Sequence, residues 1–136
     1  MKAGSGIALF CLAVLTARAP AVAQAPAEEI FAPIRKSAED WNRGDLEAFM
    51  QSYEQSPQRT FVGADVARGT GAVLSRYKRS YPDADHMGKT TFSELQARPL
   101  TADLAIVKGR YNKSGIFTLV MRRGANGWRI IHDHTS

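Results

Sequence analysis

The first half of the chain repeats apolar residues at steps of three and four, the spacing that predicts amphipathic helices. The first helix is expected from Glu28 to the break at 42–44, and a second, short one follows Asp45 as its N-cap. The third begins at Thr70 and ends at Pro82. The three apolar stripes are Ile30, Phe31, Ile34, Ala38 and Trp41; Leu46, Phe49, Met50 and Tyr53; and Val73, Leu74, Tyr77 and Tyr81.

The second half changes to segments with the character of strands, joined by short turns. Four strands are predicted, at 89–98, 103–111, 115–123 and 127–135. Their joints contain Pro99, the run 112–114 and the glycines of 124–127, which suit antiparallel hairpins in a meander. A short strand is also expected at 59–63, followed by a break through Gly69, and a polar loop at 83–88 follows the third helix.

Three helices before a meander predict an α+β domain with the helices packed on one face of the sheet. A strongly curved, mainly antiparallel sheet covered in this way closes into a cone, and the open end of the cone is a pocket. The outer face needs a cover if it is apolar, and Val107, Leu119 and Met121 predict that it is. We therefore expect a homodimer built on that face.

The N-terminus has the character of an export signal. Lys2 precedes an apolar run at 7–15, and the small residues of 21–23 form a cleavage pattern. The run is shorter than the roughly 20 residues that a membrane span needs. We expect cleavage after Ala23, a tether at 24–27, a domain over 28–136, and a periplasmic or secreted product free of the membrane. An uncleaved anchor is the alternative, because Arg18 lies just past the apolar run.

Composition and charge exclude several classes of function for the mature chain. The 136 residues are 44% hydrophobic and 23% charged, which is typical of one small globular domain and excludes disorder. Loss of residues 1–23 removes Lys2, Arg18 and the single cysteine, so the formal charge falls from +5 to +3. Thiol chemistry and disulfides are then excluded. No basic cluster alternates with aromatic residues, so we expect no nucleic-acid partner.

Three segments resemble one known family. They are Trp41–Asp45 between the first two helices, Phe61–Gly63 in the first strand, and the closing Gly127–Ser136. Together they are similar to the nuclear transport factor 2-like superfamily, and within it to the SnoaL-like branch, over about 28–136. The resemblance implies a cone-shaped fold, a homodimer across the open sheet face and a pocket between helices and sheet. It does not imply one activity, because relatives include ketosteroid isomerase, scytalone dehydratase, polyketide cyclases and assembly modules.

Two classes of function follow from this resemblance. The first is an exported small-molecule-binding domain of the SnoaL-like type, acting as an acid–base isomerase, dehydratase or cyclase. The alternative is a non-catalytic homodimeric binding or assembly module, because Trp128, His132, His134 and Ser136 also resemble the association domain of calcium/calmodulin-dependent kinase II. The catalytic tyrosine and aspartate of the isomerase are not matched to positions in this sequence, so the sequence leaves catalysis open.

The last strand carries two candidate histidines. A period of two places His132 and His134 on the same face as Trp128 and Ile130, with Asp133 on the opposite face. Two imidazoles near the mouth of a cone can act as acid and base or bind a ligand. The alternative is one buried sheet histidine and one exposed histidine. A His-x-His pair lacks the third protein ligand of a catalytic zinc site, so we expect no metal.

Arg110 stands among apolar residues on its strand and can clamp a carboxylate. Tyr53 and Tyr77 lie on helices that roof the cone, where a phenol offers an apolar body with a polar tip. We therefore predict that His132 and Arg110 bind an anionic, partly aromatic small molecule, flanked by the two tyrosines. The alternatives are a solvated arginine and tyrosines that only pack the core. We expect no cofactor, because the chain has no phosphate-binding glycine loop, dinucleotide fingerprint or nucleophile elbow.

Overall fold

Helices come first along the chain and long strands last, as the apolar spacing predicts. The computed structural model describes residues 27–136. Its helices are α1 (Ala27–Asn42), α2 (Leu46–Met50), α3 (Thr70–Ser80) and α4 (Ala84–Met87). Its strands are β1 (Thr60–Val62), β2 (Val66–Arg68), β3 (Phe92–Pro99), β4 (Leu104–Tyr111), β5 (Gly115–Gly124) and β6 (Gly127–Thr135).

The predicted export signal at 1–23 and most of the tether lie outside the described residues. Cleavage and export therefore stay predictions. None of the helices within 27–136 is both long and apolar enough to cross a membrane.

The first two helices have the apolar stripe and the N-cap that the sequence predicts. The stripe of α1 is buried at Ile30, Phe31, Ile34 and Trp41, so burial against the sheet stabilises the helix. The Asp45 side chain caps α2, because Oδ1 accepts a hydrogen bond from the Ala48 amide at 2.9 Å. The predicted cap is confirmed.

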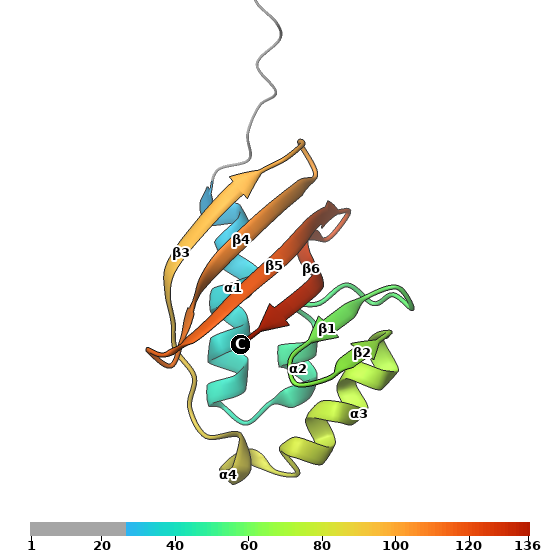
Figure 1. Cartoon of the computed structure of the whole chain (residues 1–136), viewed down its shortest axis with the longest axis vertical. Helices are drawn as coiled ribbons and strands as arrows, with labels where there is room; N and C mark the ends of the chain where they lie inside the picture. The colour runs from blue at the N-terminus through green and yellow to red at the C-terminus, as the bar shows by residue number, and fades with distance from the viewer. Residues whose placement is uncertain (1–26) are drawn as a thin grey trace, which may run out of the picture.

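All six strands form one mixed sheet in the order β2-β1-β6-β5-β4-β3 (Figure 1). The meander from β3 to β6 is antiparallel, as predicted, whereas β6 and β1 pair in parallel. The last strand is therefore a central one. Segment 52–54 also runs beside β6, since the Glu54 amide donates to the Ile130 carbonyl and the Ile130 amide donates to Ser52.

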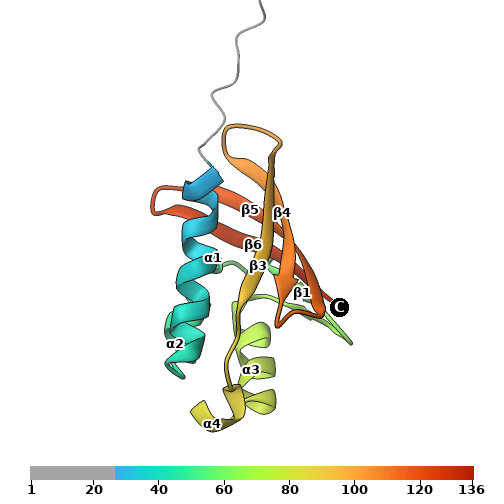
Figure 2. The ribbon, with the colours of Figure 1, turned by 90° about the vertical axis from the view of Figure 1, so that its left-hand side faces the viewer.

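One face of the sheet packs against helices and the other does not, as Figure 2 shows for the described part of the chain. The inner face, against α1, holds Val107, Leu119 and Met121, all 4% exposed or less. The prediction that these three side chains make the outer face apolar is wrong. They form the core instead, because the alternation along β4 and β5 points them toward the helices.

A β-bulge in β6 changes the face on which its last residues lie. Met121 pairs with Ile130 and Val120 pairs with His132, so Ile131 has no partner on β5. Trp128 and Ile130 therefore face the core together with Asp133, while His132 and His134 face outward beside Thr60 and Val62 of β1. The prediction that His132 and His134 share a face with Trp128 and Ile130 is wrong, because a strict period of two does not allow for the extra residue of the bulge.

Two short elements complete the fold and were not predicted. Strand β2 follows a three-residue turn after β1, where Gly-marked breaks predicted only a loop. Helix α4 lies in the expected polar loop and is capped by Asp83, whose Oδ1 accepts from the His86 amide at 2.9 Å. Both are too short for apolar periodicity to reveal them.

Candidate functional site

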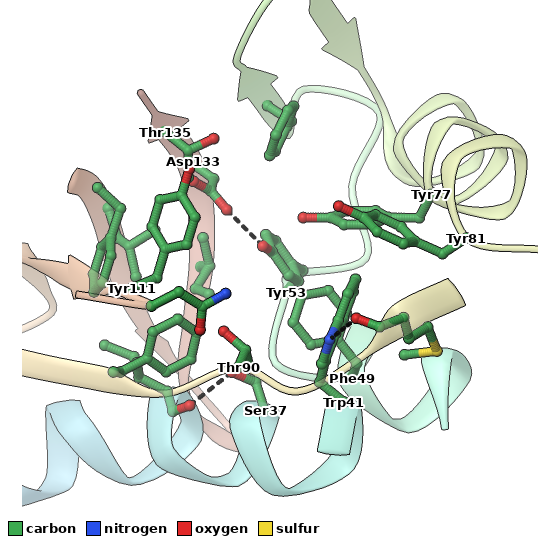
Figure 3. A pocket seen from close by; sticks show the side chains of 18 of the residues that line it. Ser37, Trp41, Phe49, Tyr53, Tyr77, Tyr81, Thr90, Tyr111, Asp133 and Thr135 are labelled. Carbon is green, nitrogen blue, oxygen red and sulfur yellow. Dashed lines mark hydrogen bonds between the residues drawn. The ribbon is translucent and has the colours of Figure 1, made fainter. Parts of the chain in front are cut away.

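A cavity of about 250 Å³ lies between the helices and the inner face of the sheet. Its lining is rich in aromatic side chains, and Figure 3 shows how side chains surround the space. The aromatic lining residues are Trp41, Phe49, Tyr53, Phe61, Tyr77, Tyr81, Phe92, Tyr111 and Phe117. Such a lining favours a flat apolar body.

Edge-to-face contacts hold this wall in place. The ring centroid of Trp41 lies 4.8 Å from that of Tyr81 and 5.0 Å from that of Phe49. The Trp41 indole nitrogen donates a hydrogen bond to the Met87 carbonyl at 2.9 Å, which ties α1 to α4. The helices and the segment around α4 therefore form a preorganised wall rather than a loose cover.

Asp133 is the one carboxylate among the described residues that line the cavity. Its side chain is buried, and Oδ2 accepts a hydrogen bond from the Tyr53 hydroxyl at 2.6 Å (Figure 3). The other oxygen, Oδ1, is buried and has no hydrogen-bond partner within residues 27–136. One oxygen is thus held by the protein, and the other is a buried acceptor without a partner among the described residues.

Burial governs the ionisation of this pair. It raises the pKa of Asp133 to about 6, against the opposing effects of the Tyr53 hydrogen bond and the charges of Arg59 and His134. Burial and the Asp133 charge also raise the pKa of Tyr53 well above its usual value. Near neutral pH, Asp133 therefore exchanges a proton readily while Tyr53 stays protonated and donates.

Arg59 supplies a buried positive charge behind Tyr53. Its Cζ lies 4.7 Å from the centre of the Tyr53 ring, and the side chain is 1% exposed. Nη2 donates to the Thr70 carbonyl at 3.4 Å, whereas Nε and Nη1 have no partner in the described part of the chain. The positive charge of Arg59 acts through space on Asp133 and favours its ionised form.

More hydroxyl groups point into the space beside this pair. Figure 3 shows the hydroxyls of Tyr77 on α3 and of Tyr81, the C-cap residue of that helix, directed toward Tyr53. Burial raises the pKa of Tyr77, so its phenol remains a hydrogen-bond donor. Ser37 and Thr90 add further polar groups on the side of α1. The cavity therefore combines an apolar wall with several convergent donors.

Two cations, Arg76 and Lys89, also line the cavity. Arg76 lies over Phe61, with Cζ 4.9 Å from the ring centre, and pairs with Asp65. Lys89 donates to the Asn42 carbonyl. Arg76 thus comes from α3, whereas Lys89 comes from the segment between α4 and β3.

The structure brings together only part of the predicted site. Tyr53 and Tyr77 line the cavity, as predicted, but His132, His134 and Arg110 do not. The bulge at Ile131 turns both histidines outward, where Thr60 Oγ1 and His132 Nδ1 lie 2.5 Å apart. Arg110 also faces outward and donates to Glu94 at 3.1 Å.

The residues that sequence reasoning missed are Asp133 and Arg76. Period-two alternation assigned Asp133 to the wrong face, and no pattern in the sequence singled out Arg76. The consecutive apolar residues Ile130 and Ile131 interrupt the alternation and are the signal of the bulge. Among residues 27–136, no three His, Cys, Asp or Glu side chains form a group able to hold a metal.

No protein-family model matches the chain, and no curated protein matches it. Solved structures do match. A protein of unknown function from Shewanella oneidensis MR-1, described as NTF-2 like, is 32% identical with a TM-score of 0.75, covering 82% of this chain and 99% of that one. A candidate dehydratase of the NTF2-like family from Streptomyces avermitilis is 20% identical with a TM-score of 0.61, covering 81% and 94% of the two chains.

A third solved structure has a similar fold. An NTF2-like protein of unknown function from Pseudomonas putida KT2440 is 19% identical with a TM-score of 0.60, covering 80% of this chain and 84% of that one. The last two likenesses concern the fold alone, whereas the Shewanella protein is also similar in sequence over almost its whole length.

Proposed function

Because the chain belongs to the nuclear transport factor 2-like superfamily, we propose that it is a small-molecule enzyme in which Asp133 moves a proton. The observation that carries this proposal is the buried Asp133 carboxylate, with one oxygen bound by Tyr53 and the other facing no protein partner within the described residues. The reaction class is an isomerisation, dehydration or cyclisation that begins with proton transfer from carbon. The likeness to a candidate dehydratase is compatible with this class.

Each group has a separate part in the proposed reaction. Asp133 Oδ1 accepts a proton from an acidic C–H bond of the substrate, because a pKa of about 6 leaves the carboxylate ionised yet basic near neutral pH. Tyr53 holds Oδ2 and fixes the carboxyl plane. The Tyr77 and Tyr81 hydroxyls can donate to the oxygen on which charge develops, and the aromatic wall excludes water.

A simple proton-exchange assay tests this function without knowledge of the natural substrate. The probe is 2-tetralone, a flat ketone with acidic C–H bonds, incubated with the protein in D2O and followed by NMR. We expect deuterium incorporation whose rate rises as pH increases through about 6. Asp133→Asn should lower the rate about 100-fold or more. Equal rates for Asp133→Asn and the parent protein would contradict the proposal.

We also propose a homodimer on the outer face of the sheet, although not through the residues first expected. The outer face offers Ile106, Ile116 and Val120 on β4 and β5, and Ile116 is 49% exposed. No helix of the described chain covers this face (Figure 2). Light scattering at micromolar concentration should give a molecular mass twice that of the monomer. The Val120→Lys variant should give the mass of a monomer.

A further inference from the structure

The charges around the cavity are arranged asymmetrically. The only described acid in its lining is the buried Asp133, whereas two cations, Arg76 and Lys89, line it as well. A ligand with one anionic end would be repelled by ionised Asp133 and attracted by the cations. Its apolar body would then lie along the aromatic wall, which leaves the reacting carbon to face Asp133.

Arg76 is the better placed of the two cations. Its guanidinium stacks on Phe61 at 4.9 Å, and its side chain is only 22% exposed. The neighbouring Gly63 leaves room for this stack, because an added Cβ would lie 3.0 Å from Phe61 Cε1 and 3.5 Å from Arg76 Nη2. The stacked guanidinium retains hydrogen-bond donors at its edge, the geometry that suits a carboxylate.

A carboxylate from the protein already occupies this position. Asp65 pairs with Arg76 from the turn between β1 and β2, and its own side chain is 65% exposed. Asp65 itself does not line the cavity. Because Asp65 is largely exposed, water solvates its carboxylate once it leaves Arg76, so an incoming carboxylate can replace Asp65 at small cost.

We propose that the cavity binds an organic carboxylate whose anionic end displaces Asp65 from Arg76. The ligand class is a monocarboxylate with a flat apolar or aromatic body of a size that fits about 250 Å³. In the free protein, Asp65 keeps the guanidinium paired and oriented. This inference deepens the proposed function and rests on the same cavity, but it concerns the end of the ligand that does not react.

Lys89 provides an internal comparison. Its side chain is exposed at the edge of the cavity, and its ammonium group already donates to the Asn42 carbonyl. Within residues 27–136 no aromatic ring lies beneath its ammonium group, whereas Arg76 lies over Phe61. Lys89 should therefore add a general positive potential, whereas Arg76 makes the specific contact.

The experiment measures the binding of matched carboxylates and carboxamides by calorimetry. The probes are 2-naphthoate and trans-cinnamate with their carboxamides, at about pH 8 so that Asp133 is ionised. We expect the parent protein to prefer each carboxylate. Arg76→Gln should weaken carboxylate binding about tenfold and leave carboxamide binding unchanged, which also shows that the variant folds.

The Asp65→Asn variant gives the most direct test, because freeing Arg76 should strengthen carboxylate binding several-fold. Lys89→Gln should change the affinity for carboxylates less than twofold. The inference is overturned if neither carboxylate binds the parent protein at millimolar concentration, if carboxamides bind equally well, or if Asp65→Asn does not increase the affinity.

The failure of this inference and that of the proposed function are distinguishable. Deuterium exchange of the neutral 2-tetralone depends on Asp133 and not on Arg76. Exchange that requires Asp133, without a preference for carboxylates, overturns only the ligand class. A carboxylate preference that requires Arg76, with exchange unchanged in Asp133→Asn, overturns only the proposed chemistry.

Discussion

The two faces of β6 place neighbouring ionisable residues in opposite surroundings. On the inner face, burial raises the pKa of Asp133 to about 6. On the outer face, His132 is partly exposed, and its pKa is lowered by burial and by the charge of His134. The aspartate thus titrates near neutral pH in the cavity, while the histidines, the usual residues for that task, lie outside it. Position relative to the core therefore decides which ionisable residue of β6 titrates inside the cavity.

The largest test of this comparison is the pH dependence of stability. The pKa of Asp133 is about 6 in the folded protein and 3.8 for an aspartate exposed to water, as in the unfolded chain. Between these two pH values the folded state binds a proton that the unfolded chain has lost. Stability therefore falls as pH rises through that window, by about 3 kcal/mol from this group. Asp133→Asn should be more stable than the parent by up to that amount at about pH 8, and its advantage should vanish below about pH 4.

Urea unfolding of both proteins at the two pH values measures this effect. The matched variant on the outer face is Thr118→Ser, whose stability relative to the parent should change little over the same range, because the exposed Thr118 side chain carries no ionisable group. An Asp133→Asn gain that is independent of pH would show that the carboxylate is not desolvated as the structure indicates.

The second test compares packing on the two faces of β4. A Cβ added at the buried Gly109 would lie 2.7 Å from Phe117 Cζ and 2.9 Å from Leu95 Cδ2. Gly109→Ala should therefore lower the free energy of unfolding by about 2 kcal/mol through overpacking. The adjacent outward-facing Lys108→Ala should change it by less than about 0.5 kcal/mol. Chemical denaturation of the two variants measures the contrast, and similar losses would contradict the assignment of faces.

The fold was largely readable from the sequence because its signals are periodic. Stripes such as Ile30, Ile34 and Trp41 mark a helix that must cover a sheet, and short turns mark the hairpins between the last four strands. The parallel pairing of β1 with β6 was not readable, because it joins segments some seventy residues apart in the chain, as in Thr60 with His132. Local patterns carry no information about such a contact.

The candidate site was less readable, because it depends on a single irregularity. One extra residue, Ile131, exchanges the places of Asp133 and the two histidines. Both predicted tyrosines line the cavity, Tyr77 from the apolar stripe of α3. The helical placement of Tyr53 is wrong, because α2 ends at Met50 and Tyr53 forms a bridge with Ile130 of β6. Arg76 was missed because its partners, Phe61 and Asp65, come from other elements.

A third test acts on the link between Tyr53 and Asp133. Tyr53→Phe removes a buried hydrogen bond and should lower the free energy of unfolding by about 1 kcal/mol. It should also raise the pKa of Asp133, because the hydrogen bond favours the ionised form. Carbon-13 NMR of the carboxyl group, assigned with Asp133→Asn, follows this titration. Arg59→Met should raise the pKa in the same direction through loss of a positive charge, and a fall in either variant would contradict the geometry.

The smallest effect is expected on the outer face, at Arg110. Its guanidinium donates to Glu94 at 3.1 Å, but the two side chains are 40% and 65% exposed, so water screens the pair. Arg110→Ala should change the free energy of unfolding by less than about 0.5 kcal/mol. It should also leave the affinity for 2-naphthoate unchanged, since the sheet separates Arg110 from the cavity, whereas Arg76→Gln lowers that affinity. Calorimetry that measures the 2-naphthoate affinity of both arginine variants shows which face of the sheet binds the anion. A loss of affinity in Arg110→Ala that matched the loss in Arg76→Gln would place the carboxylate outside the cavity and break the distinction between the faces.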